Sequence, residues 1–398
     1  MEFRFSKSVG TLTSSAVRDI LKLTQGQEII SFAGGLPAEE LFPLEAVRAA
    51  ADRVFALGHK TLQYGVTEGH VPLREQLCVR MAAKSMDVHP EQMLLTTGSQ
   101  QAIDLVARVL TEPGDVVLVE SPTYLASLQV FRMYGLRVVS VDSDAHGMLI
   151  DEAERLMQTL NPRLVYVVPT FGNPTGRTWS TERRKGLVAL SQRYGVPVIE
   201  DDPYGDIRFD EQLQVPTLMS MQPTVDGGGV IYLGSFSKTV APALRTGWAI
   251  ADREVVRMMA KAKQAADLHS SMLDQQTLDQ LLQVFPLDDH IRHVSSAYAS
   301  RMQAMQKELE SRGRGDLSWQ EPLGGMFLWL ELPEALDAQT LLRAAVLKGV
   351  AFVPGTSFFA EKPKRNTARL NFTHTGGERM RQGIARLFEA MDEFLARC

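Results

Sequence analysis

Lys238, which directly follows a strongly apolar segment, is the residue best placed to do chemistry. It ends Gly234-Ser235-Phe236-Ser237-Lys238, just after the apolar run 230–233, and Arg245 follows seven residues later. A lysine that follows two serines at the end of a buried strand is unusual for a solvated surface. Two chemistries use such a lysine. It could act as the base for a Ser235 nucleophile, or it could form a Schiff base while the hydroxyls and Arg245 bind a phosphate. The first also needs Ser-Asp-Asn and Lys-Thr-Gly elements, and the sequence has neither.

Three consecutive acids end another apolar run. Residues 196–199 lead into Glu200-Asp201-Asp202-Pro203-Tyr204. Carboxylates crowded at the end of a buried strand repel one another unless a cationic group is bound nearby. A metal site or a helix N-cap would also explain them. A metal site, however, would want further His, Asp or Glu ligands at the other strand ends, which offer few.

Two turns carry groups that could contact a ligand. Thr97-Gly98-Ser99-Gln100 joins a strand near 94–96 to a helix at 100–110. A glycine, a hydroxyl and a helix N-terminus suit a phosphate, although such turns also occur for structural reasons alone. Asn173-Pro174-Thr175-Gly176 is a good turn in its own right, and its Asn173 amide could meet a bound ring oxygen.

Alternating strands and helices must position these groups. β-Branched runs at 116–119, 137–141, 164–168, 196–199, 230–233 and 247–250 predict strands buried on both faces. Between them, helices are expected at 100–110 and at 181–194, the second beginning after Ser180 or Thr181 and ending at Gly195. This pattern predicts an α/β fold with a mostly parallel sheet, whose ligands bind at the carboxyl ends of the strands.

The alternation of short apolar strands and helices ends near residue 285. A long charged helix at 288–312 is expected to connect two domains, and strands at 324–330 and 368–372 with helices at 338–348 and 377–396 predict a smaller α+β domain. Near the start, an amphipathic helix at 14–23 precedes a Gly34-Gly35-Leu36-Pro37 turn. The expected division is an N-terminal arm with a substrate-facing helix at 1–40, a large domain at 41–286 and a small domain at 287–398.

Composition narrows the classes of function. The 398 residues carry a formal net charge of −5 without long runs of like charge, so we expect no nucleic-acid or membrane partner. Cys78 and Cys398 are far apart and have no nearby paired His, which argues against a disulfide framework and a metal site. The N-terminal residues lack a signal-peptide pattern, and we expect a cytoplasmic protein.

In chain order, these motifs resemble those of the fold-type I, class I/II aminotransferases that use pyridoxal 5′-phosphate. The matching segments are Thr-Gly-Ser-Gln-Gln from residue 97, Asn-Pro-Thr-Gly from residue 173, Asp-Asp-x-Tyr from residue 201 and Ser-x-Ser-Lys from residue 235, with Arg245 beyond. Ser-Phe-Ala-Gly-Gly-Leu-Pro from residue 31 and the preceding segment 17–24 are most similar to the 2-aminoadipate, or multi-substrate, branch. The resemblance covers essentially the whole chain.

The resemblance implies a role for each matching residue. Lys238 would form the Schiff base with the cofactor and then move the substrate Cα proton, and Asp201 would keep the pyridine nitrogen protonated. Tyr204 and Asn173 would hydrogen-bond the 3′ oxygen of the cofactor, and Tyr124 would stack on its ring. The phosphate would be held by Gly98, Ser99, Gln100, Ser235, Ser237 and Arg245, with Tyr64 reaching it from the partner subunit of a homodimer.

The substrate contacts follow from the same resemblance. Arg369 would bind the α-carboxylate in a bidentate pair, with Asn173 beside it. Gly35 would let the chain pass close to the substrate. Arg18, with Ser15 one turn earlier, would recognise the distal carboxylate of acidic substrates. Without the resemblance, Arg18 and Arg369 would be interpreted as surface charges.

The implied activity is transfer of an amino group between an L-amino acid and a 2-oxo acid such as 2-oxoglutarate. 2-Aminoadipate and glutamate are the first candidate donors, with leucine and aromatic amino acids next. Two alternatives stay open: a lyase or decarboxylase on the same scaffold, and a pyridoxal phosphate-sensing transcriptional regulator that lacks catalysis. A regulator needs a DNA-binding module ahead of this fold, and only about 40 residues precede the large domain.

Overall fold

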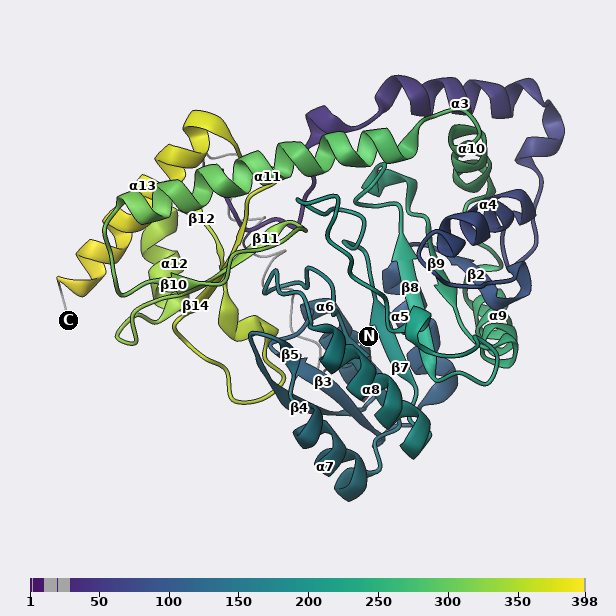
Figure 1. Ribbon diagram of the computed structural model, residues 1–398, viewed down its shortest axis with the longest axis horizontal. Coiled ribbons are helices and arrows are strands. Elements are labelled where there is room, and N and C mark those ends of the chain that lie inside the picture. Colours follow the sequence, from purple (N-terminus) through teal and green to yellow (C-terminus); the bar gives the residue numbers. More distant parts are fainter. Residues whose placement is uncertain (2, 11–19, 21–28, 397–398) are drawn as a thin grey trace.

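The computed structural model describes residues 1, 3–10, 20 and 29–396. The core of the fold is an eight-stranded sheet in the order β2-β9-β8-β7-β6-β3-β4-β5 (Figure 1). The strands are β2 (Met93–Thr96), β3 (Val116–Ser121), β4 (Arg137–Asp144), β5 (Gly147–Met148), β6 (Leu164–Val167), β7 (Val198–Asp201), β8 (Val230–Ser235) and β9 (Gly247–Ile250). The pairs β4-β3, β3-β6, β6-β7 and β7-β8 are parallel, and β9 is antiparallel to β8 and β2. The predicted mostly parallel sheet is confirmed, so the carboxyl ends of β2, β8, β7, β6, β3 and β4 lie along one edge.

Helices cover both faces of this sheet. One face packs against α5 (Ser99–Leu110), α6 (Leu125–Met133) and α9 (Arg253–Asp267). The other face packs against α4 (Val71–Ala82), α7 (Ile150–Leu160), α8 (Thr181–Tyr194) and α10 (Met272–Leu282), and α3 (Leu44–Ala56) lies on α10. Because both faces are covered, the inner strands β6, β7 and β8 are buried at every position.

The predicted start and end of the helix at 181–194 are confirmed. The predicted burial of the strand at 137–141 on both faces is wrong. The Ser180 hydroxyl accepts the Arg183 backbone N–H at 3.3 Å, and Gly195 ends the helix with a φ of 63°. β4 alternates between buried positions such as Val139 and exposed ones such as Arg137. Only the two-residue β5 lies beyond it in the sheet, so β4 is not covered as the inner strands are.

A second, antiparallel sheet lies beside the first, in the order β10-β11-β14-β13. Its strands are β10 (Ser318–Trp319), β11 (Phe327–Glu331), β13 (Val353–Pro354) and β14 (Thr367–Asn371), and its helices are α12 (Ala338–Leu347) and α13 (Gly377–Leu395). A parallel pair, β1 (Ile30–Ser31) with β12 (Val350–Ala351), adjoins it.

The long helix α11 (Leu287–Ser311) connects the two parts (Figure 1). Leu287 and Ile291 belong to the apolar cluster that contains α4 and α10, whereas Met302 and Leu309 belong to the cluster shared with the second sheet. The expected connecting helix is therefore present and is anchored at both ends.

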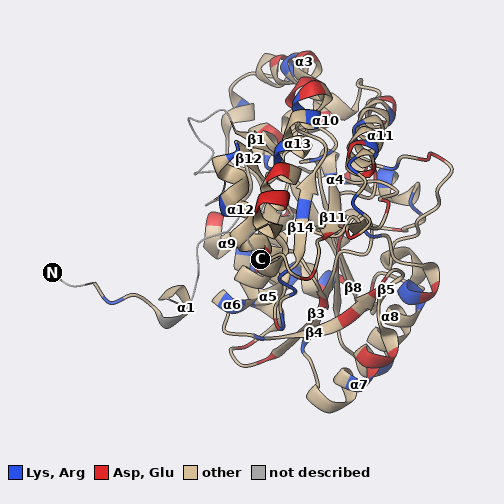
Figure 2. Ribbon diagram, turned by 90° about the vertical axis from the view of Figure 1, so that its left-hand side faces the viewer, with Lys and Arg blue, Asp and Glu red and all other residues tan. Residues whose placement is uncertain are grey.

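The remaining elements are short. They are α1 (Lys7–Gly10) and the 3-10 turns η1 (Glu39–Leu41), η2 (His59–Leu62), η3 (Pro90–Gln92), η4 (Met219–Met221), η5 (Pro242–Leu244) and η6 (Gly355–Phe358). Figure 2 shows the N-terminal end of the chain leading away from the body of the molecule. The helix expected at 14–23 falls outside the described residues except for Ile20. No described helix is long and apolar enough to cross a membrane.

A fully buried arginine fastens the loop that follows β6. Arg184, on α8, donates to the backbone carbonyls of Pro169 at 2.7 Å, Pro216 at 3.1 Å and Trp179 at 3.2 Å. The loop beginning at Pro169 carries Asn173, so the hydrogen bonds of Arg184 help to hold this loop in place at the end of β6.

Replacing Arg184 with Met should lower the free energy of unfolding in urea by at least about 3 kcal/mol. The reason is that two buried carbonyls and one partly buried carbonyl lose their donor, at about 1–3 kcal/mol each. Arg183→Met is the matched control. Arg183 pairs with Asp144 at 2.7 Å near the surface, and its loss should cost about 1 kcal/mol or less. Equal losses in the two variants would contradict the role given to Arg184.

Candidate functional site

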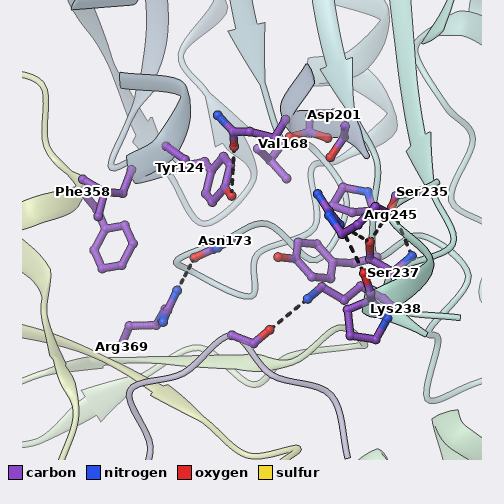
Figure 3. A pocket seen from close by; sticks show the side chains of 18 residues that line it. Tyr124, Val168, Asn173, Asp201, Ser235, Ser237, Lys238, Arg245, Phe358 and Arg369 are labelled. Atoms are coloured by element: carbon purple, nitrogen blue, oxygen red, sulfur yellow. Dashed lines mark hydrogen bonds between the residues drawn. The ribbon is translucent and has the colours of Figure 1, made fainter. Parts of the chain in front are cut away.

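A cavity of about 310 Å³ lies between the carboxyl ends of the central strands and the second sheet (Figure 3). Segments that follow β2, β3, β6, β7 and β8 line one side, and β14 and η6 line the other. Most of the residues singled out in the sequence meet here: Gly35, Ser99, Gln100, Tyr124, Asn173, Asp201, Tyr204, Ser235, Ser237, Lys238, Arg245 and Arg369. Residues separated by hundreds of positions thus form one lining.

Lys238 presents a buried amine to the cavity. Its Nζ donates to the backbone carbonyl of Gly35 at 2.9 Å. Burial, followed by the positive charges of Arg369 and Arg245, lowers the pKa of Lys238 to about 8. A substantial fraction of this amine is therefore neutral, and hence nucleophilic, near pH 8.

Asp201 presents one free carboxylate oxygen. Tyr166 donates its hydroxyl to Oδ2 at 2.7 Å, while the buried Oδ1 has no hydrogen-bond partner among the described residues. Burial raises the pKa of Asp201 to about 7, against the lowering effect of Tyr166. Because a buried acceptor without a donor is costly, Oδ1 is suited to receive a hydrogen bond from a ligand, best from a cationic N–H.

The two acids that flank Asp201 lie on the opposite face of β7. Glu200 accepts the backbone N–H groups of Leu218 at 2.7 Å and Met219 at 3.0 Å at the start of η4. Asp202 accepts the hydroxyl of Tyr232 at 2.9 Å. Glu200 is therefore not the N-cap residue of a helix, but its carboxylate accepts the first backbone N–H groups of the 3-10 turn η4. In the described part of the chain, no group of three His, Cys, Asp or Glu residues could hold a metal ion.

The start of α5 forms an anion cradle. Gly98 precedes the helix with a φ of 75° and offers no side-chain cap, which leaves the first backbone N–H groups available to a ligand. A Cβ at Gly98 would lie 2.5 Å from Nη2 of Arg245, so only glycine lets the arginine approach. Arg245 donates to the Ser237 hydroxyl at 3.2 Å, and Ser235 donates to Ser237 at 2.9 Å.

Arg369 reaches the cavity from β14 (Figure 3). Its Nη1 donates to Oδ1 of Asn173 at 2.8 Å and its Nη2 to the carbonyl of Ala33 at 2.5 Å. The guanidinium carbon lies 4.3 Å from the ring centre of Phe327 and 5.2 Å from that of Phe358. Burial lowers its pKa to about 10, and only 2% of the residue is exposed. The interpretation of Arg369 as a surface charge is therefore wrong.

Two phenols complete the lining. The Tyr124 hydroxyl lies 3.5 Å from Oε1 of Gln100. Burial raises the pKa of Tyr124 to about 12 and that of Tyr204 well above its usual value, so both stay protonated hydrogen-bond donors.

Four of the predicted residues are not part of this lining. Gly98 lies just behind it, against Arg245. Tyr64 is 77% exposed, and its ring lies 5.7 Å from that of His269. Arg18 and Ser15 lie outside the described residues.

Other contributors escaped the sequence analysis. Tyr166 lies in the middle of β6, where an aromatic residue is usually core. The strand register places it opposite Ile199, two positions before Asp201 and on the same face, which the sequence alone does not reveal. Phe358 in η6 and Phe327 in β11 reach Arg369 only through the tertiary fold, so no local pattern could have identified them.

Comparison with known proteins agrees with this geometry. Residues 27–387 match the family model described as aminotransferase class I and II. The chain is 40% identical over 396 residues to the aromatic-amino-acid aminotransferase 1 of Thermococcus litoralis, covering 98% of this chain and 94% of the relative. It is 40% identical over 393 residues to the 2-aminoadipate transaminase of Thermus thermophilus, covering 98% and 97%.

A solved structure extends the likeness to three dimensions. The crystal structure of an α-aminoadipate aminotransferase from Thermus thermophilus, complexed with N-(5′-phosphopyridoxyl)-L-leucine, matches with a TM-score of 0.92 and 38% identity. The match covers 99% of this chain and 98% of that one. The sequence motifs, the cavity and these relatives agree: the chain is an aminotransferase and belongs to the class I and II family.

Proposed function

We propose that this aminotransferase holds pyridoxal 5′-phosphate in the cavity and moves an amino group between an L-amino acid and a 2-oxo acid. The observation that carries the proposal is the convergence of the Lys238 amine and the free Asp201 oxygen on one cavity. The Lys238 amine can react with the aldehyde of the cofactor, and the free Asp201 oxygen can accept a hydrogen bond from its ring nitrogen. The likeness to an enzyme complexed with a phosphopyridoxyl compound supports the same cofactor.

The remaining lining fits the other groups of this cofactor. The start of α5, with Ser235, Ser237 and Arg245, offers backbone N–H groups, hydroxyls and a guanidinium to the phosphate. Tyr204 and Asn173 can donate to the 3′ oxygen, and Tyr124 can cover the ring. When bound, pyridoxal phosphate supplies an electron-withdrawing ring that stabilises the negative charge left at the substrate Cα.

Lys238 and Asp201 each act on a different proton in the proposed reaction. Lys238 would act as the base that takes the proton from the substrate Cα, a task suited to an amine whose pKa is lowered to about 8. Asp201 holds a proton on the ring nitrogen through Oδ1. Ligands that fill the cavity would displace water from both residues, which would strengthen each charge interaction.

Arg369 binds the substrate α-carboxylate. A buried guanidinium between two aromatic rings matches a carboxylate in a planar pair of hydrogen bonds. We divide the chain into an arm at 1–40, a cofactor domain at 41–286 that includes Lys238, and a domain at 287–398 that includes Arg369. In this division the substrate lies between two domains.

A homodimer would complete the cofactor site. Phe55, Leu57, Leu62, Tyr64 and Val66 are each at least 53% exposed, an unusual concentration of apolar side chains in one short segment. Phe3 and Phe5 in the N-terminal end of the chain are 69% and 80% exposed. A second copy of the chain would cover these side chains and would bring its Tyr64 hydroxyl to the phosphate.

The distal carboxylate of an acidic substrate needs one more cation. The described cations in the lining are Lys238, Arg245 and Arg369, and each already has a partner in the proposal. Arg18 is the candidate that the sequence offers. Relatives named for 2-aminoadipate and for aromatic amino acids support a preference that includes both acidic and apolar side chains.

Lys238→Ala should abolish transamination and covalent attachment of the cofactor. In the unmodified protein, borohydride reduction followed by peptide mass spectrometry should place the phosphopyridoxyl group on Lys238. Lys263, also buried but paired with Asp267 at 2.8 Å, should carry none. Attachment to the cofactor-free protein should accelerate as the pH rises through about 8, because the neutral amine reacts. A modified peptide elsewhere, or turnover by Lys238→Ala, would overturn the assignment.

Tyr64→Phe should raise the dissociation constant of pyridoxal phosphate about tenfold, the cost of one hydrogen bond to a charged group. Light scattering should give twice the chain mass of 44.1 kDa for both proteins. Tyr194→Phe, which loses a surface contact to Glu154, is the control and should bind the cofactor normally. A monomeric unmodified protein, or unchanged affinity in Tyr64→Phe, would contradict the shared site.

Arg18→Ala should lower kcat/KM for 2-aminoadipate about tenfold or more and leave leucine within about twofold, because only the acidic substrate loses a charged partner. Arg18→Lys should retain part of the preference. Equal losses for the two amino acids would show that Arg18 does not contact the substrate side chain.

A further inference from the structure

Two tyrosine–aspartate pairs lie back to back across the central sheet. Asp201 and Asp202 are adjacent residues at the end of β7 and therefore point to opposite faces. Tyr166 of β6 donates to Oδ2 of Asp201 at 2.7 Å, and Tyr232 of β8 donates to Oδ2 of Asp202 at 2.9 Å. Both tyrosines are fully buried, so the chain contains a natural matched pair.

The two aspartates differ in what else surrounds them. Asp202 has Lys84 at 3.9 Å and lies on the face away from the cofactor cavity. Asp201 lines that cavity and makes no ion pair within the described residues. In the structure as described, the Tyr166 hydroxyl is the hydrogen-bond donor that holds the Asp201 carboxylate.

We infer that Tyr166 is the positioning residue for the cofactor's ring nitrogen. Its hydroxyl occupies Oδ2 of Asp201, so the unpartnered Oδ1 is the oxygen presented to the ring. This inference rests on the proposed function, in which Asp201 pairs with that nitrogen. Tyr166 itself touches neither cofactor nor substrate and acts through Asp201.

Tyr166 is held rigidly enough for this task. Its register opposite Ile199 places it on the Asp201 face of the sheet. Its ring meets that of Phe131 edge-on, with 5.7 Å between ring centres. Burial raises the pKa of Tyr166 well above its usual value, so the hydroxyl keeps its proton and remains a donor.

The hydrogen bond also supports the charge of Asp201. Burial alone favours the neutral acid, whereas the donated bond from Tyr166 lowers the pKa of Asp201. An ionised Asp201 pairs more strongly with a protonated ring nitrogen than a neutral acid does. Loss of the Tyr166 hydroxyl should therefore weaken the contact with the nitrogen in particular.

A comparison of two cofactors tests this inference. The dissociation constants of pyridoxal phosphate and of its analogue with carbon in place of the ring nitrogen are measured by fluorescence on each cofactor-free protein. The unmodified protein should prefer the natural cofactor, and Tyr166→Phe should reduce that preference about tenfold. The ratio of the two constants does not depend on the folded fraction, because both cofactors bind the same folded molecules.

Two further variants separate the possible outcomes. Tyr232→Phe removes the equivalent hydroxyl on the far face and should keep the unmodified ratio. If Asp201→Ala keeps that ratio, the proposed role of Asp201 fails, and the inference fails with it. If Asp201→Ala loses the preference while Tyr166→Phe retains it, the inference alone is overturned.

Discussion

One buried hydrogen bond, from Arg369 to Asn173 at 2.8 Å, joins the two sheets across the cavity. The arginine belongs to β14 and the asparagine to the loop after β6, so the bond forms only when the two sheets lie side by side. Isolating an arginine from water costs several kcal/mol unless partners compensate. Here two hydrogen bonds and two aromatic faces do so. The position of Arg369, the proposed carboxylate-binding residue, therefore depends on how the two sheets pack together.

The cavity carries the opposite charge to the protein around it. The chain has a net charge of −5, yet Lys238, Arg245 and Arg369 converge on one small volume. Burial and mutual repulsion lower the pKa of Lys238 to about 8 and contribute to its reactivity. In the proposed function, an anionic cofactor and an anionic substrate would both relieve this repulsion. The same electrostatics would then account for ligand binding and for the lowered pKa of the Lys238 amine.

Much of the site could be predicted because the chemistry lies at strand ends. Glycine and hydroxyl residues at 97–100, Asn173 and the Ser-x-Ser-Lys segment are each next to an apolar run in the sequence, and a parallel sheet gathers such positions at one edge. The mostly parallel sheet and the helix at 181–194 were predictable for a similar reason, since periodicity and caps are local signals.

The rest depends on contacts between distant segments. The burial of Arg369, the aromatic rings on either side of it and the Tyr166 hydroxyl on Asp201 follow from how strands pair, which local patterns do not encode. The predicted burial of 137–141 failed because apolar residues alone do not reveal that a strand lies near the edge of a sheet. Tyr64 is 77% exposed and lies outside the cavity lining of the single chain, so its proposed role could not be read from the fold of one chain.

A single half-reaction tests the central claim most directly. Holoprotein is mixed with 2-aminoadipate in the absence of any 2-oxo acid, and the products of one turnover are quantified. We predict one equivalent of the corresponding 2-oxo acid, with the cofactor recovered in its amine form and no carbon dioxide. Release of carbon dioxide, or loss of the amino group as ammonia with the aldehyde form of the cofactor retained, would contradict it.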